Sequence, residues 1–273
     1  MTSKIHPSAI VEDGAVLGAD VEIGPYSVIG SSVRLGYGVR LASHVVVTGN
    51  TEIGPRTVVH AHAVLGGSSQ FRNPPGGDAE SGLRIGADNV IREHVTMNMG
   101  TAKGGNLTQV GDRGYFMAYS HVAHDCHIGN DVTFANSVAI AGHVVVEDGV
   151  TVGGLAAVLQ YVRLGRGCFI GGVTGIAADV IPYGLVQGSR GVMEGLNVLG
   201  LKRRGLVRSD LHKMRAAYDM LFFGAGSFQE RVEKVAVNWP DVPLVQEIVA
   251  FIRAASKRPI CMPGAGSSAA DNS

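Results

Sequence analysis

The amino-acid sequence predicts a mainly β fold, a parallel β-helix of hexapeptide repeats followed by a small C-terminal α-helical domain. The first observation is an aliphatic or aromatic residue at every sixth position, from Val11 to Leu65 and again from Val110 to Ile176. The second is the composition, because 39 glycines with only 6% aromatic residues are unusual for a globular enzyme and point to a repetitive structure. The third is the end of this period near residue 190, where helical signals begin.

The totals bound the class of protein. A chain of 273 residues with 45% hydrophobic residues can bury a core without disulfides. Lysine plus arginine and aspartate plus glutamate both number 23, which argues against nucleic acid as a partner. The sequence lacks a signal-peptide pattern and an 18-residue apolar stretch, so we expect a cytoplasmic protein without an integral membrane segment. Three cysteines without a CxxC pair favour free thiols.

The six-residue period determines the shape of the predicted β-helix. A second column, two positions before each aliphatic residue, holds small or β-branched residues. Two inward positions in every six predict short strands joined by tight corners, with three hexapeptides in each coil of a triangular prism. A third short run from Ile85 to Met97 is out of step, which predicts inserted loops near 66–84 and 98–109. A charge at the inward position Ile140 should be severely destabilising, because each buried aliphatic side chain contributes ~1.5–3 kcal/mol.

The chain is expected to divide into three parts. The stretch SDLHKMRAAYDMLFF predicts a helix that Ser209 can cap, and Ser227 with Glu230 predicts a capping box for the next helix. LVQEIVAFIRAAS predicts a last helix, and the residues after it are rich in proline, glycine, alanine and serine, which favours disorder. The predicted parts are a β-helix with its inserted loops at 1–189, an α-helical domain at 190–258 and a disordered tail at 259–273.

Residues 121–130, HVAHDCHIGN, could hold a metal ion or supply a base. Cys126 falls in the small inward column, which favours packing. His121 and His127 share one phase of the repeat but lie on successive faces of the prism, so one chain cannot easily close them around an ion. We therefore expect no metal. His124 lies outside both inward columns, at or beside a corner, where it can reach solvent or a neighbouring chain.

One coil further along the chain is 18 residues away, and stacked residues lie at about the strand spacing of ~4.8 Å. A neutral imidazole in such a stack can accept a proton from a hydroxyl, and a carboxylate beside it can orient the ring. A glycine one coil above leaves its backbone N–H open to a carbonyl that develops negative charge. Whether the carboxylate turns toward the imidazole stays open. The two stacked columns are His124, Gly142 and Gln160, and beside them Asp125, His143 and Tyr161.

Four motifs in order resemble a known family: SHVVV at 43–47, HVAHDCHIGN, AGHV at 141–144 and LKRRG at 201–205. The chain resembles the acyl-[acyl carrier protein]–UDP-N-acetylglucosamine O-acyltransferases of lipid A biosynthesis, which belong to the hexapeptide-repeat acyltransferases. The resemblance implies a left-handed β-helix and a homotrimer with active sites between subunits. It also implies transfer of a 3-hydroxyacyl group from acyl carrier protein to the 3-position of the UDP-sugar, without a cofactor or a metal.

The resemblance also assigns roles to residues. It implies His124 as general base, Asp125 as its partner and Gly142 as the backbone donor to the thioester oxyanion. Substrate-binding positions are also implied. These are His121 and His143 in the cleft, Gln160 at the nucleotide, Gly172 at the acyl pocket, and Asn197, Arg203 and Arg204 at the UDP end.

The sequence departs from the family in positions that concern the acceptor. Leu159 stands where many members have histidine, and Leu199 where they have glutamate. The first inserted loop lacks the family's aspartate and lysine, and Arg72 is the candidate to replace the lysine. Since the base region is intact, an alternative acceptor is a UDP-sugar with a 3-amino group.

Other interpretations stay open. Histidines from two chains could bind zinc in an enzyme resembling the γ-class carbonic anhydrases. The related N-acyltransferase of the same pathway usually carries an extra N-terminal domain, whereas the coils here begin near residue 5. A non-enzymatic scaffold is the third alternative. A basic C-terminal cluster could dock the acidic carrier protein, bind the nucleotide or merely face solvent. It comprises Lys202, Arg203, Arg204, Arg208, Lys213 and Arg215.

Overall fold

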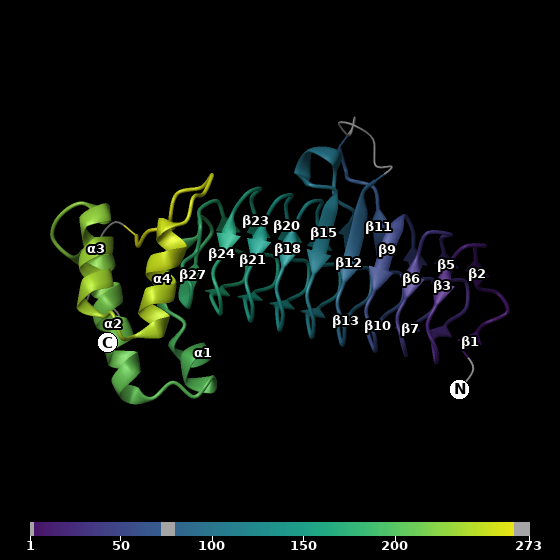
Figure 1. Ribbon diagram of the computed structural model, residues 1–273, viewed down its shortest axis with the longest axis horizontal. Coiled ribbons are helices and arrows are strands. Elements are labelled where there is room, and N and C mark those ends of the chain that lie inside the picture. The colour runs from purple at the N-terminus through teal and green to yellow at the C-terminus, as the bar shows by residue number, and fades with distance from the viewer. Residues whose placement is uncertain (1–2, 72–79, 265–273) are drawn as a thin grey trace.

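Three β-sheets form the walls of a triangular prism, and helices lie at its C-terminal end (Figure 1). The computed structural model describes residues 3–71 and 80–264. Within these residues sheet A has 11 strands, sheet B nine and sheet C eight. Consecutive strands pass from one sheet to the next, so three strands complete one coil. The predicted fold, a left-handed parallel β-helix followed by a small helical region, is confirmed.

The strands are short, and most contain only two residues. Sheet A contains β1 (Lys4–Ile5), β4 (Glu22–Ile23), β7 (Arg40–Leu41), β10 (Val58–Val59), β13 (Val90–Ile91), β16 (Tyr115–Phe116), β19 (Thr133–Phe134), β22 (Thr151–Val152), β25 (Phe169–Ile170), β27 (Gly184–Gln187) and β28 (Val192–Leu196). Sheet B contains β2 (Ile10–Val11), β5 (Val28–Ile29), β8 (Val46–Val47), β11 (Val64–Gly67), β14 (Thr96–Asn98), β17 (His121–Val122), β20 (Ala139–Ile140), β23 (Ala157–Val158) and β26 (Gly175–Ile176). Sheet C contains β3 (Val16–Leu17), β6 (Arg34–Leu35), β9 (Asn50–Ile53), β12 (Gly82–Ile85), β15 (Leu107–Val110), β18 (His127–Ile128), β21 (Val145–Val146) and β24 (Arg163–Leu164).

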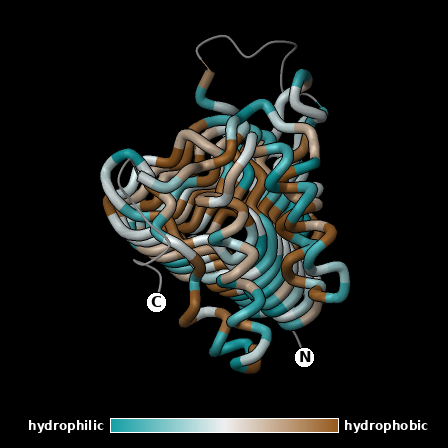
Figure 2. The backbone as a smooth tube through the Cα atoms, turned by 90° about the vertical axis from the view of Figure 1, so that its left-hand side faces the viewer, coloured by the Kyte–Doolittle hydropathy of each residue, from teal (hydrophilic) through white to brown (hydrophobic). Residues whose placement is uncertain are grey.

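The coils stack in the register that the six-residue period predicts. On sheet B, His121 pairs with Ala139 and Ala139 pairs with Ala157, one coil of the repeat apart each time. The side chains at every sixth position point inward, and those of Phe134 and Ile140 have no exposed surface. Viewed along the long axis, the coils lie behind one another (Figure 2). The core is therefore one continuous apolar column in which each coil covers its neighbours.

The corner between sheets B and C carries the columns predicted to hold the site. Asp125, His143 and Tyr161 occupy the same place in three successive coils, with φ values of 59°, 61° and 67°. Positive φ is uncommon for residues other than glycine, and it turns the chain sharply here. The His143 amide donates a hydrogen bond of 3.1 Å to the His124 carbonyl, which ties one corner to the next. This backbone arrangement stacks the three side chains along the edge of the prism.

The two predicted insertions lengthen the coils on sheet C. Ile53 pairs with Ile85, and Ile85 pairs with Val110, so both intervals exceed the regular coil length. The first insertion lies between β11 and β12, and its residues 72–79 are outside the described residues. The second lies between β14 and β15 and contains a short 3-10 helix, η1 (Ala102–Gly104).

Helices follow the last coil, as expected. The capping box of Ser227 and Glu230 is present at the start of α3 (Phe228–Asn238). The expected cap at Ser209 is wrong, because the Leu211 amide bonds to the Val207 carbonyl and the helix therefore begins before Ser209. Among the described helices none is both long and apolar enough to cross a membrane. The helices are α1 (Val198–Arg203), α2 (Arg208–Phe223), α3 (Phe228–Asn238) and α4 (Pro243–Arg253).

Both predicted boundaries of the helical part differ from the structure. The β structure continues past residue 189, because β27 and β28 form an antiparallel hairpin that ends at Leu196. Disorder from residue 259 onward is wrong for residues 259–264. Ile260 pairs with Asp179 at the last coil, and the amide of Cys261 donates a hydrogen bond to the Asp179 carbonyl. Cys261 is consequently only 3% exposed. The remaining predicted tail, 265–273, lies outside the described residues.

Candidate active site

Four of the predicted site residues line one cavity of about 190 Å³ on the corner between sheets B and C. His121 comes from β17, and His124 follows it at the corner. Gly142 and Gln160 occupy the place of His124 in the next two coils. The stacking that the 18-residue interval predicts is therefore present in this chain. The other lining residues are Gln70, Phe71, Asn98, Ala123 and Ala141.

His124 and Asp125 form a hydrogen-bonded pair. The Nδ1 atom of His124 lies 2.7 Å from Oδ2 of Asp125, which answers the question that the sequence left open. The two side chains are 6% and 0% exposed, so water screens their interaction little. With a proton on Nδ1 donated to the carboxylate, Nε2 of the neutral ring is an acceptor. The pair can therefore accept a proton at Nε2 and stabilise the resulting imidazolium.

The Asp125 carboxyl is held in its ionised form. Burial by itself would raise its pKa, but hydrogen bonds from the hydroxyl and the amide of Thr101, together with the one from His124, outweigh burial. The pKa of Asp125 consequently lies below its ordinary value. At neutral pH this side chain is therefore an acceptor of hydrogen bonds and carries a negative charge beside the imidazole.

Gly142 packs directly against the imidazole of His124. A Cβ atom at this position would overlap Cε1 and Nε2 of the ring, so the position admits only glycine while the ring stays in place. The Gly142 amide makes no hydrogen bond to any residue that the structure describes. An unpaired N–H at the cavity wall can stabilise an oxyanion that forms near Nε2.

The neighbouring histidines favour their neutral forms. Burial lowers the pKa of His121, whose Nδ1 lies 2.7 Å from the hydroxyl of Thr96. Burial also lowers the pKa of His143, although Asp125 acts in the opposite direction. The ring of His143 meets the ring of His124 edge-on, with centroids 5.0 Å apart. The rings of His121 and His143 are therefore less readily protonated than a free imidazole, whereas the ring of His124 is hydrogen-bonded to a carboxylate.

The column above His143 extends the site toward the C-terminal segment. Tyr161 stacks on His143 with ring centroids 4.5 Å apart. Nζ of Lys257 lies 3.9 Å above the ring of Tyr161, and Arg258 donates to the carbonyl of Gln160. Residues near the end of the described chain therefore support the coil next to the catalytic corner.

His124, Asp125 and His143 are also the one group of side chains in the described residues that could hold a metal ion. Both oxygens of the Asp125 carboxylate already accept hydrogen bonds from Thr101, and Oδ2 accepts one from His124 as well.

The Cys126 side chain donates to the Ala141 carbonyl, and burial raises the pKa of its thiol to about 12. Cys126 is therefore a packing residue, as predicted, and not a thiolate ligand.

The remaining predicted residues lie on other edges of the prism. Gly172 is on the corner between sheets A and B. Arg204 lies over Gly149 on the corner between sheets C and A, where it donates to the Gly149 carbonyl at 3.1 Å. Asn197 caps α1 and donates to the carbonyl of Gly167 on that corner. Arg203 is exposed, and Arg72 is outside the described residues. One chain therefore does not bring these residues to His124.

Sequence reasoning missed three residues at the site. The ring of Phe71 lies 4.5 Å from that of His124, and with the second loop it leaves His124 only 5% exposed, although an exposed corner was expected. Asn98 is buried in the cavity wall, with an Oδ1 atom that lacks a partner in the described residues. Thr101 bonds to Asp125. All three belong to or border the inserted loops, where the six-residue period no longer assigns a side chain to a face.

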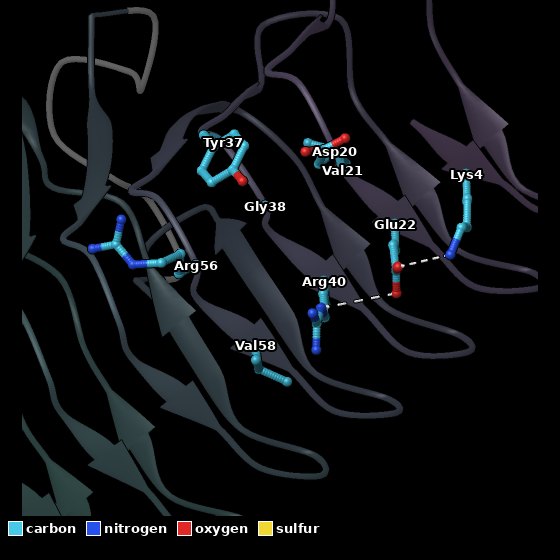
Figure 3. A pocket seen from close by; sticks show the side chains of 9 residues that line it. All are labelled: Lys4, Asp20, Val21, Glu22, Tyr37, Gly38, Arg40, Arg56 and Val58. Carbon is cyan, nitrogen blue, oxygen red and sulfur yellow. Dashed lines mark hydrogen bonds and ion pairs between the residues drawn. The ribbon is translucent and has the colours of Figure 1, made fainter. Parts of the chain in front are cut away.

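A larger cavity, about 510 Å³, lies near the N-terminus and is a weaker candidate. Figure 3 shows Glu22 on its wall between Lys4 and Arg40. Glu22 lies 3.4 Å from Lys4 and 3.9 Å from Arg40, so these charges largely satisfy one another. The cavity contains no histidine, and a base with a pKa near neutrality is therefore absent from its lining residues.

Comparison with known proteins agrees with the geometry. The family profile described as "Udp N-acetylglucosamine O-acyltransferase; Domain 2" matches residues 179–261. A relative from Sinorhizobium fredii, named acyl-[acyl-carrier-protein]--UDP-N-acetylglucosamine O-acyltransferase, is 46% identical over 265 residues, which are 97% of each chain. The chain belongs to this acyltransferase family.

Solved structures of UDP-N-acetylglucosamine acyltransferases share the whole architecture. One is 39% identical, with a TM-score of 0.91, and the match covers 96% of this chain and 100% of that one. The enzyme from Campylobacter jejuni is 35% identical, with a TM-score of 0.89 and the same coverage. In this acyltransferase family member, as in those structures, the prism and the C-terminal helices are therefore parts of one fold.

Proposed function

We infer that this protein transfers a 3-hydroxyacyl group from acyl carrier protein to the 3-hydroxyl of UDP-N-acetylglucosamine, the first step of lipid A synthesis. Membership of the acyltransferase family supports this reaction. The observation that carries the catalytic assignment is the buried pair of His124 and Asp125 beneath Gly142.

The reaction follows from this arrangement. Nε2 of His124 accepts the proton of the sugar hydroxyl as its oxygen attacks the thioester carbonyl. The carbonyl oxygen gains the negative charge, which the N–H of Gly142 stabilises, while Asp125 stabilises the imidazolium. When the intermediate collapses, the carbon–sulfur bond breaks and the imidazolium returns the proton to the departing thiolate. The products are the sugar ester and the free thiol of the carrier protein.

We propose that the complete site forms between protomers of a homotrimer. The residues implied for the acyl and UDP ends, Gly172 and Arg204, lie on the two corners of the prism that do not carry His124. Neighbouring chains can supply them. Light scattering should give three times the chain mass, and a monomeric enzyme with full activity would contradict this assembly. Mixing equal amounts of inactive His124→Ala and Arg204→Ala chains should restore about a quarter of the active sites if the two residues act across an interface.

The acceptor alternative, a UDP-sugar with a 3-amino group, rests on the departures from the family pattern near the acceptor. Phe71 places an apolar ring against the base, and Leu159 and Leu199 are exposed where the family has polar residues. Mass spectrometry of products from a panel of hydroxyacyl carrier proteins and the two UDP-sugars decides between them. Preferential acylation at the oxygen of UDP-N-acetylglucosamine would exclude the amine.

For the carrier protein we propose a docking surface on the C-terminal helices. Lys202, Arg208, His212 and Arg215 line a cavity of about 420 Å³ beside α2. Of the predicted basic cluster, Lys213 instead pairs with Asp210 at 3.1 Å. Reversing the charge at both positions, with Arg208→Glu and Arg215→Glu, should raise KM for the carrier protein and leave KM for the sugar unchanged. Equal changes in both would contradict this docking surface.

Two controls separate this reaction from its rivals. Metal analysis of the purified protein is the first control. If it finds stoichiometric zinc that is required for activity, the result would favour the enzyme resembling the γ-class carbonic anhydrases, with His124, Asp125 and His143 as metal ligands. His124→Ala should abolish acyl transfer while the fold, followed by circular dichroism, stays intact. Retained activity in this variant would remove the base from the mechanism.

A further inference from the structure

The second inserted loop lies directly against the carboxylate of Asp125. The amide of Thr101 donates to Oδ1 at 2.7 Å, and its hydroxyl donates to Oδ2, also at 2.7 Å. Thr101 is 2% exposed and the Asp125 side chain is fully buried. One residue thus binds both carboxylate oxygens, one of which also accepts the hydrogen bond from His124.

The loop is itself fixed in this position. The carbonyl of Thr101 accepts hydrogen bonds of 2.9 Å from the amides of Gly104 and Asn106. Gly104 lies so close to Asp125 that a Cβ atom there would overlap the carboxylate. At the end of the loop, the hydroxyl of Thr108 accepts a hydrogen bond of 2.8 Å from the Asp125 amide. The carboxylate therefore has very little freedom to rotate or shift.

The orientation of the base depends on this carboxylate. The bond to Asp125 is the one side-chain hydrogen bond of the His124 ring to any described residue, and the other contacts of the ring are with Phe71, Gly142 and His143. Packing restricts the plane of the ring but does not choose which nitrogen carries the proton. That choice belongs to the acceptor beside Nδ1.

We propose that Thr101 is a positioning residue for the catalytic base. By holding both oxygens of Asp125, Thr101 keeps the proton of the neutral His124 ring on Nδ1. Nε2 is then free to accept the proton of the sugar hydroxyl. The inference rests on the proposed function, since it assigns a task within the same mechanism. It gives the second insertion a catalytic purpose, because a coil of regular length would lack a segment on the far side of Asp125.

The kinetic test uses three variants. Thr101→Val removes the hydroxyl but keeps the shape and the backbone donor, and Thr101→Ser restores the hydroxyl. Thr57→Val is the matched control, since Thr57 is equally buried and bonds to the Gly86 carbonyl at 3.0 Å in a distant coil. We expect Thr101→Val to lower kcat about tenfold or more, with KM for both substrates unchanged. Thr101→Ser should stay within about twofold of the parent, and Thr57→Val should affect only stability.

Nuclear magnetic resonance of protein labelled with nitrogen-15 in histidine supplies a readout that a merely structural role would leave unmoved. In the parent protein His124 should show one tautomer, protonated at Nδ1. In Thr101→Val the two nitrogen shifts should move toward each other as the second tautomer becomes populated. Gly104→Ala displaces the same carboxylate without deleting a donor, so it repeats the test should the valine variant fail to fold.

Two results would overturn the inference: a kcat loss no larger in Thr101→Val than in the Thr57 control, or an unchanged single tautomer in folded Thr101→Val. The tautomer measurement needs no acyl transfer, so it stands apart from the proposed reaction. If His124→Ala kept full activity, the reaction mechanism would fail instead. Loss of activity in His124→Ala with a normal Thr101→Val enzyme would reject only the positioning role.

Discussion

Gly142→Ala tests the packing of the catalytic corner most directly. The added methyl group would overlap Cε1, Nε2 and Nδ1 of the His124 ring. The backbone is not the obstacle, because Ala61 and Ala118 occupy the equivalent position of the hexapeptide, before a residue with positive φ, at the corner between sheets A and B. The ring itself must therefore move. It can move only by pushing against Phe71 or by giving up its hydrogen bond to Asp125.

The magnitude follows from these two routes. Overpacking a buried site typically costs 1–3 kcal/mol, and losing a hydrogen bond to a charged group costs about 1.5–3 kcal/mol. We expect Gly142→Ala to lower the free energy of unfolding by about 3 kcal/mol. Because a displacement of the base by about 1 Å costs on the order of a hundredfold in rate, kcat should fall at least that far.

Urea denaturation and an acyl-transfer assay by mass spectrometry measure both effects. The decisive control is the same substitution in a His124→Ala background, where no ring remains for the methyl group to meet. There the destabilisation by Gly142→Ala should fall to a few tenths of a kcal/mol. A full loss of stability in both backgrounds would refute the overlap between Gly142 and His124 as its cause.

Three further predictions concern a corner glycine, the apolar core and the carboxylate of Asp125. Gly149→Ala should lower the unfolding free energy by about 1–3 kcal/mol, because the residue has a φ of 66°, where a side chain strains the backbone. The guanidinium of Arg204, which a Cβ atom would overlap, is the exposed end of a flexible side chain and can move away. A melting temperature equal to the parent's would contradict this prediction. Ile140→Asp should abolish folding, since it places a charge in a fully buried column, and soluble folded protein on size-exclusion chromatography would disprove this. Asp125 has a lowered pKa in the folded protein, so its ionised form stabilises the fold above its unfolded pKa of about 3.9, and this contribution is lost as pH falls through the folded value. Asp125→Asn should therefore show a smaller loss of stability than the parent between about pH 5 and pH 2 in urea titrations, and parallel profiles would reject that role.

The repeat made most of the fold predictable. A residue's place in the six-residue period assigns it to the core, a face or a corner, and the next coil repeats the assignment one coil later. The stacking of Gly142 over His124 follows from this arithmetic alone, because identical backbone circuits place equivalent residues above one another. The contact between His124 and Gly142 was therefore predictable from the repeat alone, without knowledge of any long-range contact.

The period gave no information where the chain leaves it. Thr101 and Phe71 belong to insertions, and nothing in their spacing says that the loops fold back over the corner. The pairing of Ile260 with Asp179 was missed for a related reason, since proline and glycine nearby suggested disorder although the short apolar stretch finds a strand end to join. Contacts between segments far apart in sequence have no local signature.

The segment that carries Lys257 and Arg258 has a consequence for how the protein is made. Coils can form one after another as a chain leaves the ribosome, because each needs only the coil before it. Lys257 and Arg258 contact the coil of Tyr161 and Gln160, although Arg258 follows Gln160 by 98 residues in the chain. We expect nascent chains to form the three walls of the prism early and to complete the surroundings of the catalytic corner only after Lys257 and Arg258 have also left the ribosome.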